Sequence, residues 1–360
     1  FYILDDYTPL RKIADERSIL KSESHIFPVS DAKIYLQTGG KYGQGASLFT
    51  APNEPFGASI TYFLKETPKT LREIRQESEK ELFKNKKTIP QLTPEAQIAE
   101  LSEEPPCLLF SIYDSQNRLV RKISTSPKKG INRVTWDLRY SSTTPVRMKD
   151  NKYNPLEKGR SGISVMPGVY KVSAEMIVRG ESMPVGSPVS FNTVSLNNSS
   201  IPAADKAELL RFQEEVAEMA AVITGITGEI QASLSEMAQI RQTLQNSHSS
   251  DPGLQTTARK LNEGLMELSY KITGPEAIAS QEEVPPMLMP AEQRLNFLAE
   301  SSLSSTSPVT ETQQEALKIL QKQVPGFRGT LTDLKAGMDQ LRKEMNEKGL
   351  PWTPGRVLNY

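Results

Sequence analysis

The chain has very few of the residues on which metal and thiol chemistry depends. Its 360 residues include one cysteine, Cys107, and two histidines, His25 and His248. A single cysteine cannot form a disulfide within the chain, which is compatible with a reducing compartment or with a bacterial envelope protein that has no bridges. Neither histidine has a second histidine or a cysteine at metal-ligand spacing. We therefore predict no metal site, no cofactor and no catalytic residue in this chain.

Net charge and long hydrophobic runs are also missing. Lys+Arg and Asp+Glu number 43 each, so the formal net charge is zero. A balanced chain gains little from counterion release on a phosphate backbone, and we predict no nucleic-acid partner. No apolar stretch approaches the about 18 residues of a membrane-spanning helix, and we predict no membrane span. Short basic clusters, Lys84, Lys86 and Lys87 and then Lys128 and Lys129, are expected to be solvated surface.

Nucleotide and hydrolase motifs are absent as complete patterns. Gly43-x-Gly45 lacks the third glycine and the following helix of a dinucleotide-binding loop. No G-x-S-x-G nucleophile elbow occurs, and Ser18-x-x-Lys21 stands without the companion motifs that would make it a serine nucleophile. The sequence therefore indicates neither nucleotide binding nor acyl transfer.

Adjacent carboxylates are the remaining candidates for catalysis, because glycoside hydrolysis uses a pair of them. Asp5 and Asp6 are neighbours, but neighbouring residues on an extended strand point to opposite faces. We expect them to form a turn. Glu103 and Glu104 precede two prolines and are expected to be solvated.

Strand signals dominate residues 55–200. Residues 57–64 contain an apolar run without strict alternation, typical of a strand that is buried on both faces or bulged. Residues 107–123 suggest strand, turn and strand, and three later segments alternate with one apolar face each. The inward residues of these segments are Val134, Trp136 and Leu138; Tyr170, Val172, Ala174, Met176 and Val178; and Val189 and Phe191. This pattern predicts an immunoglobulin-like β-sandwich. A charged helical insertion is expected at about 66–104, with Leu71, Ile74 and Leu82 as its apolar stripe.

After residue 200 the apolar period changes from two to three and a half. A seam of heptad-spaced residues predicts a helix from about Ala203 to Gln245, roughly 65 Å long. Its members are Leu209, Val216, Ile223, Ile230, Met237 and Leu244, with Phe212, Met219, Ile226, Ser233 and Ile240 in the second register. The same spacing predicts a second helix whose apolar residues are Leu254, Ala258, Leu261, Leu265, Leu268 and Ile272.

A short helix is expected around 293–299, followed by a final long helix. Thr310 and Gln313 form a capping box at its start, and Pro325 should kink it. Its seam consists of Leu317, Leu320, Val324, Phe327, Leu331, Leu334, Met338, Leu341 and Met345. Long helices joined by short turns predict an antiparallel helical bundle with a buried seam. The alternative is an exposed seam that binds a second chain.

The two ends of the chain carry apolar or aromatic residues outside these patterns. Residues 1–10 are predicted to be a strand that runs into a turn and a proline-containing loop, and residues 15–55 a connector. Because the strand has no hairpin partner nearby, we expect further β-structure to precede it. Trp352 is held between prolines after the last helix, and it either pins the tail to a neighbouring domain, which we favour, or contacts a partner.

Several segments together resemble one protein family. FYILDDYTPLR resembles the closing strand of a β-propeller. APNEPFGASITYFLK, CLLFSIYDSQNRLVRKI, GINRVTWDLRY and MPGVYKV resemble the domain after that propeller, and KGLPWTPGR the end of the same proteins. The family comprises large bacterial secreted proteins with a sortilin-like BNR (Asp-box) propeller, often labelled glycosyl hydrolases. The resemblance covers nearly the whole chain, in order. It implies that any ligand binding or glycosidase-like activity belongs to the propeller, and no catalytic residue is carried over.

These observations define an α+β multidomain protein in three segments. Residues 1–54 would be a remnant propeller strand and connector, residues 55–200 the sandwich, and residues 201–360 the bundle with an extended tail. The favoured function is a non-catalytic structural and interaction segment, secreted or in the bacterial envelope. Its partners would be the N-terminal propeller of the same protein, as a separate or cleaved segment, and other envelope proteins.

Two other functions remain open. In the second hypothesis the chain is the C-terminal part of a glycoside hydrolase whose active site lies in the propeller, with Asp5 and Asp6 at the edge of its cleft. Upstream S-x-D-x-G-x-T-W boxes with inward carboxylates would favour this enzyme. The third hypothesis is an intracellular coiled-coil scaffold, which a signal peptide would eliminate.

Overall fold

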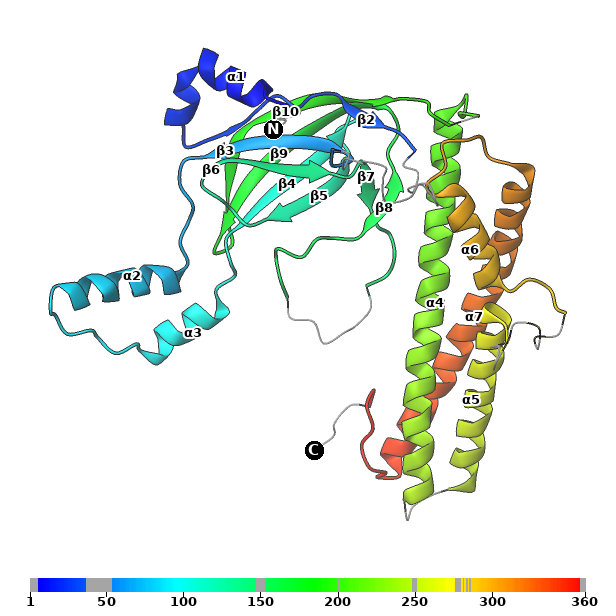
Figure 1. Cartoon of the computed structure of the whole chain (residues 1–360). Coiled ribbons are helices and arrows are strands. Elements are labelled where there is room, and N and C mark those ends of the chain that lie inside the picture. Colours follow the sequence, from blue (N-terminus) through cyan, green and yellow to red (C-terminus); the bar gives the residue numbers. More distant parts are fainter. Residues whose placement is uncertain are drawn as a thin grey trace. The chain divides into compact units, whose positions relative to one another are not determined.

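The chain has a mixed α and β fold. The computed structural model describes residues 6–36, 54–146, 153–199, 201–247, 251–275, 280, 282, 284 and 286–356 (Figure 1). It divides into two compact units. The first unit is Phe1–Ser142 with Asp150–Pro202, and the second is Thr143–Lys149 with Ala203–Tyr360. The three-segment division of the sequence stays a prediction.

The described residues of the first unit form three sheets. The largest has the strand order β2-β10-β9-β4-β5, the second has the order β1-β3-β6, and β7 pairs only with β8. All pairings are antiparallel except that of β2 with β10, which is parallel. The strands are β1 (Ser24–Ile26), β2 (Ala32–Ile34), β3 (Ala58–Leu64), β4 (Cys107–Asp114), β5 (Leu119–Thr125), β6 (Gly130–Trp136), β7 (Arg139–Ser141), β8 (Ser161–Ser164), β9 (Gly168–Val178) and β10 (Glu181–Ser195).

The two larger sheets share one hydrophobic core. Trp136 of β6 is fully buried, and its ring centroid lies 5.2 Å from that of Tyr170 on β9. Tyr62 of β3 meets Phe110 of β4 at 5.2 Å. The predicted inward face of β9 is confirmed, because its alternate residues from Tyr170 to Val178 are all buried. Alternation of apolar side chains therefore places one face of each strand in the space that the sheets share.

Strand β3 is buried on both faces, as its continuous apolar run predicted. Ile60 faces the shared core, whereas Phe63 packs with Ile19 and Phe27 in a second, smaller cluster. Residues 15–36 supply the second cover, since they contain the 3₁₀ helix Arg17–Lys21 and the strands β1 and β2. The expectation of an irregular connector from residue 15 was therefore wrong for this part, and residues 37–53 lie outside the described residues.

The prediction of a strand and a loop over residues 1–10 was wrong for the loop, because a helix begins at Thr8. Residues Thr8–Asp15 form helix α1 with Pro9 in its first turn. Backbone N–H groups in the first turn have no partner within the helix, so a proline there costs no helix hydrogen bond. Asp6 Oδ1 accepts a hydrogen bond from Thr8 N at 2.9 Å. The proline that suggested a loop thus stands at a helix start. Phe1–Asp5 lie outside the described residues, so the remnant propeller strand stays a prediction there.

The predicted charged insertion is helical. It contains α2 (Leu71–Lys84) and α3 (Pro94–Ser102). Thr70 and Glu73 form a capping box at the start of α2, and Thr93 accepts from Ala96 N at the start of α3. Neither helix contains a buried residue, so the stripe of Leu71, Ile74 and Leu82 does not pack into a core.

The second unit contains four helices in its described residues: α4 (Lys206–Asn246), α5 (Pro252–Thr273), α6 (Ala291–Ser302) and α7 (Glu311–Glu347). They share one hydrophobic core. The predicted capping box of Thr310 and Gln313 is confirmed. Helix α7 continues through Pro325, and the kink at this residue stays a prediction.

The heptad seam is buried within the chain. Ile223, Ile230 and Leu331 are 2%, 1% and 7% exposed. An outward-facing seam for a second chain would have left these side chains in water. The sequence therefore placed the apolar side of α4 and α7 correctly, and the alternative of an exposed stripe is wrong.

Polar contacts show the direction of the helices. Glu215, Glu229 and Glu236 of α4 bind Gln321, Lys335 and Arg342 of α7, each pair 106 residues apart. A constant offset means that α4 and α7 run in the same direction. Leu334 of α7 lies over Gly264 of α5, and Leu261 of α5 lies over Gly337 of α7, so α5 runs opposite to α7.

Candidate functional site

His25 is held by packing on β1. Its ring meets Phe27 edge to face at 4.9 Å between centroids. Burial lowers the pKa of His25, and its Nε2 atom is buried with no hydrogen-bond partner among the described residues. The ring packs against Phe27, a member of the small cluster beside β3. His248 lies outside the described residues.

Cys107 is a buried residue at the start of β4. Its Sγ atom donates to the carbonyl oxygen of Pro155 at 3.7 Å. Burial raises the pKa of the Cys107 thiol. Because the thiolate is the nucleophilic form, these surroundings favour a structural thiol.

The carboxylates considered for glycoside hydrolysis hold helix ends and turns. Partial burial acts to raise the pKa of Asp6, but hydrogen bonds from Thr8 and Ser30 outweigh it and lower the pKa. Glu103 Oε2 accepts from the backbone N–H of Leu71, in the first turn of α2, at 2.6 Å. Glu104 is exposed, and Asp5 lies outside the described residues. The described carboxylates thus serve the local fold.

The remaining candidates from the sequence are Ser18 and the glycines Gly43 and Gly45. Ser18 lies in the 3₁₀ helix, and its hydroxyl donates to Glu16 at 3.3 Å. Gly43 and Gly45 lie outside the described residues. Within the described part of the chain, no group of three or more His, Cys, Asp or Glu could hold a metal ion. No helix there is long and apolar enough to cross a membrane.

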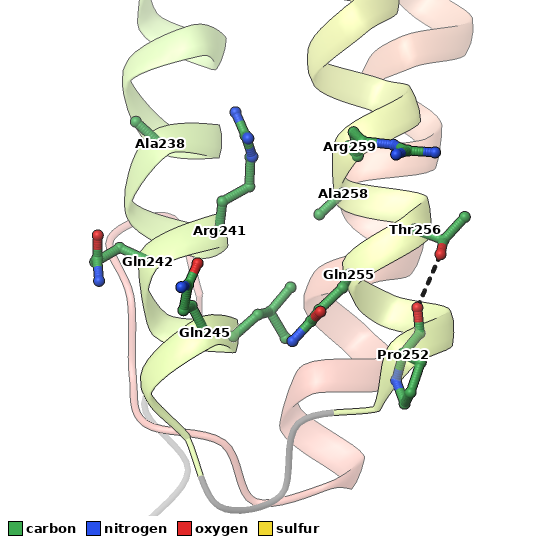
Figure 2. Close-up of a pocket in the computed structure, with 10 residues that line it drawn as sticks. Ala238, Arg241, Gln242, Gln245, Pro252, Gln255, Thr256, Ala258 and Arg259 are labelled. Carbon is green, nitrogen blue, oxygen red and sulfur yellow. Dashed lines mark hydrogen bonds between the residues drawn. The ribbon is translucent and has the colours of Figure 1, made fainter.

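A groove of about 560 Å³ lies between the end of α4 and the start of α5 (Figure 2). Arg241 of α4 extends into the space between the two helices, where Gln255 also points, and Gln245 belongs to the lining. Leu244 and Ala258 are buried at its base. Its rim therefore offers amide and guanidinium groups over an apolar floor.

The polar groups of this groove differ in their partners. Arg241 forms no ion pair among the described residues, whereas Arg259 pairs with Glu263 at 3.6 Å. Thr256 Oγ1 donates to the carbonyl oxygen of Pro252 at 2.9 Å, as Figure 2 shows. The described residues that line the groove carry hydrogen-bond donors and include no carboxylate or imidazole.

Residues 65–106, which we call the arm, leave β3 and return to β4 through α2 and α3 (Figure 1). Arg75 of α2 binds Glu100 of α3 through Nε at 2.5 Å and Nη2 at 2.9 Å, and Nη1 binds Glu79 at 2.7 Å. The hydrogen bonds that Arg75 donates to Glu100 and Glu79 raise the pKa of its guanidinium above the ordinary value. The fork of one guanidinium thus fastens the two helices of the arm together.

The arm exposes large apolar side chains. Phe83 is 74% exposed and Leu101 81% exposed, and Ile74, Ile89, Leu92 and Ile98 are also open to solvent. These side chains are exposed on a hairpin whose two helices are both capped. The sequence predicted a charged helical insertion with an apolar stripe of Leu71, Ile74 and Leu82, and it did not indicate that Phe83 and Leu101 would be the most exposed apolar residues of the arm.

The tail after α7 is a compact turn. The Arg356 guanidinium donates to Asn346 Oδ1 at 2.7 Å and to the backbone carbonyls of Leu350 and Pro351. Trp352 Nε1 donates to the carbonyl oxygen of Arg356 at 2.7 Å, and its side chain stays 51% exposed. Trp352 therefore braces the turn and leaves much of its ring open. Pinning to a neighbouring domain stays a prediction.

No protein-family model matches the chain, and no curated protein matches it. The resemblance to sortilin-like propeller proteins therefore stays a prediction based on the motifs alone.

Proposed function

We propose that the chain is a non-catalytic structural and interaction segment that supports a sortilin-like β-propeller in a secreted or envelope protein of bacteria. In this proposal the two sheets of the first unit form an immunoglobulin-like sandwich. Helices α4 to α7 form a bundle in which α5 and α6 reverse the direction of α4 and α7. The shared core of the sheets and the buried heptad seam support these assignments.

The arm is the observation that carries the interaction role. Each exposed large apolar side chain forgoes roughly 1.5–3 kcal/mol of burial. The arm nevertheless keeps Phe83 and Leu101 in water on a hairpin that Arg75 and two helix caps hold in shape. We assign the propeller of the same polypeptide as the partner that covers this apolar side.

The positions of the reactive side chains support a non-catalytic role. The thiol of Cys107 and the ring of His25 pack inside the first unit, and burial disfavours the charged form of each. Asp6 is engaged at the start of α1. Each group already has a structural task, which is what a supporting segment would require of it.

Crosslinking and mass spectrometry of the complete polypeptide test this function. Four of the arm's lysines, Lys80, Lys84, Lys86 and Lys87, should crosslink to Asp-box segments of the propeller. The double variant Phe83→Asp with Leu101→Asp should remove these crosslinks, because two carboxylates cannot enter an apolar interface without a large cost. Met266→Asp, at an exposed apolar position on α5, is the matched control and should preserve them. Unchanged crosslinks in the double variant would show that the arm does not bind the propeller.

A further inference from the structure

Two strands of the first unit end their sheets in the described part of the chain. Among the described strands, β5 pairs only with β4 and β6 pairs only with β3. The carbonyl oxygen of Val120 on β5 accepts a hydrogen bond from the Ser141 hydroxyl, so β6 is the better candidate for adding another strand. A groove of about 470 Å³ is lined by residues of both strands.

The floor of this groove is apolar. Ile123 of β5 and Val134 of β6 line it and also pack against the shared core, although both are only partly buried. Ser124, Thr125 and Thr135 line it as well. An extended segment placed here would bury alternate side chains on Ile123 and Val134 and leave the intervening ones toward its rim.

The lining is strongly basic. It includes Arg121, Lys122, Arg133 and Lys158, with Asp137 as the one acidic residue among those that line it. None of the four cations forms an ion pair in the described part of the chain: Arg121 donates to backbone carbonyls and Ser161, and Arg133 donates to Thr61 and the Asp6 carbonyl. The carboxylate of Asp137 accepts from the Ser161 hydroxyl. Asp137 in the lining and the electrostatic interaction of Arg133 with Asp6 offset part of this charge, and the described lining keeps an excess of cations.

We propose that this groove binds an extended acidic peptide segment, which adds to the free edge of β6 as a further strand. Apolar side chains at alternate positions contact Ile123 and Val134, and aspartate or glutamate at the others meets Lys122 and Lys158. Strand β6 spans seven residues, so the bound segment is about 23 Å long. A second copy pairing β6 with β6 would bring like charges together, which disfavours self-association as the use of this edge.

Fluorescence anisotropy with the whole chain and a labelled seven-residue peptide of alternating valine and aspartate tests the proposal. We expect saturable binding. Replacing aspartate by lysine, or grouping the valines at one end, should weaken binding by about tenfold or more. N-methylation of alternate peptide amides should weaken it similarly, because the charges remain while backbone pairing is lost. Equal binding of the basic or the N-methylated peptide would overturn the proposal.

Charge reversal locates the site. The double variant Lys122→Glu with Lys158→Glu should weaken binding about tenfold, whereas Lys33→Glu with Lys87→Glu should change it by less than about twofold. All four lysines are exposed, and Lys33 lies on β2, at the opposite edge of the five-stranded sheet. Equal losses in both double variants would mean non-specific attraction and overturn the proposal. The proposal would also be overturned if the unaltered chain were a dimer and the double variant Lys122→Glu with Lys158→Glu a monomer, because a second copy of the chain would then fill the groove.

Discussion

The two units bury their apolar residues by different rules. In the second unit one local rule, a heptad repeat, places a buried residue at nearly every turn of α4 and α7. In the first unit, strands far apart in sequence meet, as β2 and β10 do, with Thr193 opposite Ala32. A local repeat can be found from the sequence itself, whereas a non-local pairing depends on the whole arrangement. The comparison predicts different responses to substitution in the two units.

The largest effect should come from Ile223→Asp. Ile223 is almost wholly buried in the core that α4 to α7 share, and an unpaired carboxylate there should cost more than about 4 kcal/mol. We expect the helices to unfold while the sheets of the first unit remain folded. Each unit contains one tryptophan, so fluorescence can follow them separately: Trp136 reports on the first unit and Trp352 on the second.

A Trp352→Phe background isolates the Trp136 signal, and circular dichroism follows the loss of helix. Met266→Asp is the control, because Met266 lies on α5 but is exposed. Loss of the buried Trp136 signal together with the helices would show that the two units fold as one, and the comparison would fail.

Arg121→Met should have the next largest effect, and it concerns the first unit. The buried guanidinium of Arg121 donates to the carbonyl oxygens of Tyr140, Gly159 and Arg160. Its removal leaves these acceptors without their charged donor, which should lower the free energy of unfolding by about 3 kcal/mol. Urea unfolding followed by Trp136 fluorescence measures the change. Lys122→Met, one residue away but exposed, should be nearly neutral, and equal effects of the two would contradict the structural role of Arg121.

Arg121 also shows where sequence interpretation stops. Arg121 lies opposite Ile112 in the β4–β5 pairing, at an inward-facing position. A charged residue at such a position of the strand pattern was a signal for a buried polar contact. Its acceptors, however, lie 19 to 39 residues further along the chain, and no local pattern points to them. The alternating faces of β6 and β9 and the heptad seams were predictable because each depends on near neighbours. The pairing of residues 24–34 with β3 and β10, and the open apolar side of the arm, were not.

The pH dependence of the first unit should reveal His25. Burial lowers the pKa of this ring in the folded state, so the unfolded chain binds the proton more tightly. The contribution to stability is therefore complete above the unfolded pKa of about 6.5 and is lost as the pH falls from there through the lower folded pKa. Urea midpoints of the first unit at pH 7.5 and pH 5.5 measure the loss. His25→Gln should remove this part of the difference, and an unchanged difference would assign it to other groups.

The smallest effect should come from a glycine in the second unit, where the local rule can be tested almost alone. A Cβ at Gly228 of α4 would meet no atom within 4 Å, so Gly228→Ala should add helix propensity without a clash and stabilise the unit by about 0.5–1 kcal/mol. A Cβ at Gly337 of α7 would lie 2.7 Å from Leu261 Cδ2 on α5. The same substitution there gains the same propensity but must displace that leucine, so its net gain should be smaller or negative. Thermal unfolding followed by circular dichroism gives both values. If Gly337→Ala stabilised as much as Gly228→Ala, the close approach of α5 and α7 would have no energetic consequence. The stability of the helical unit would then depend at this position on helix propensity alone.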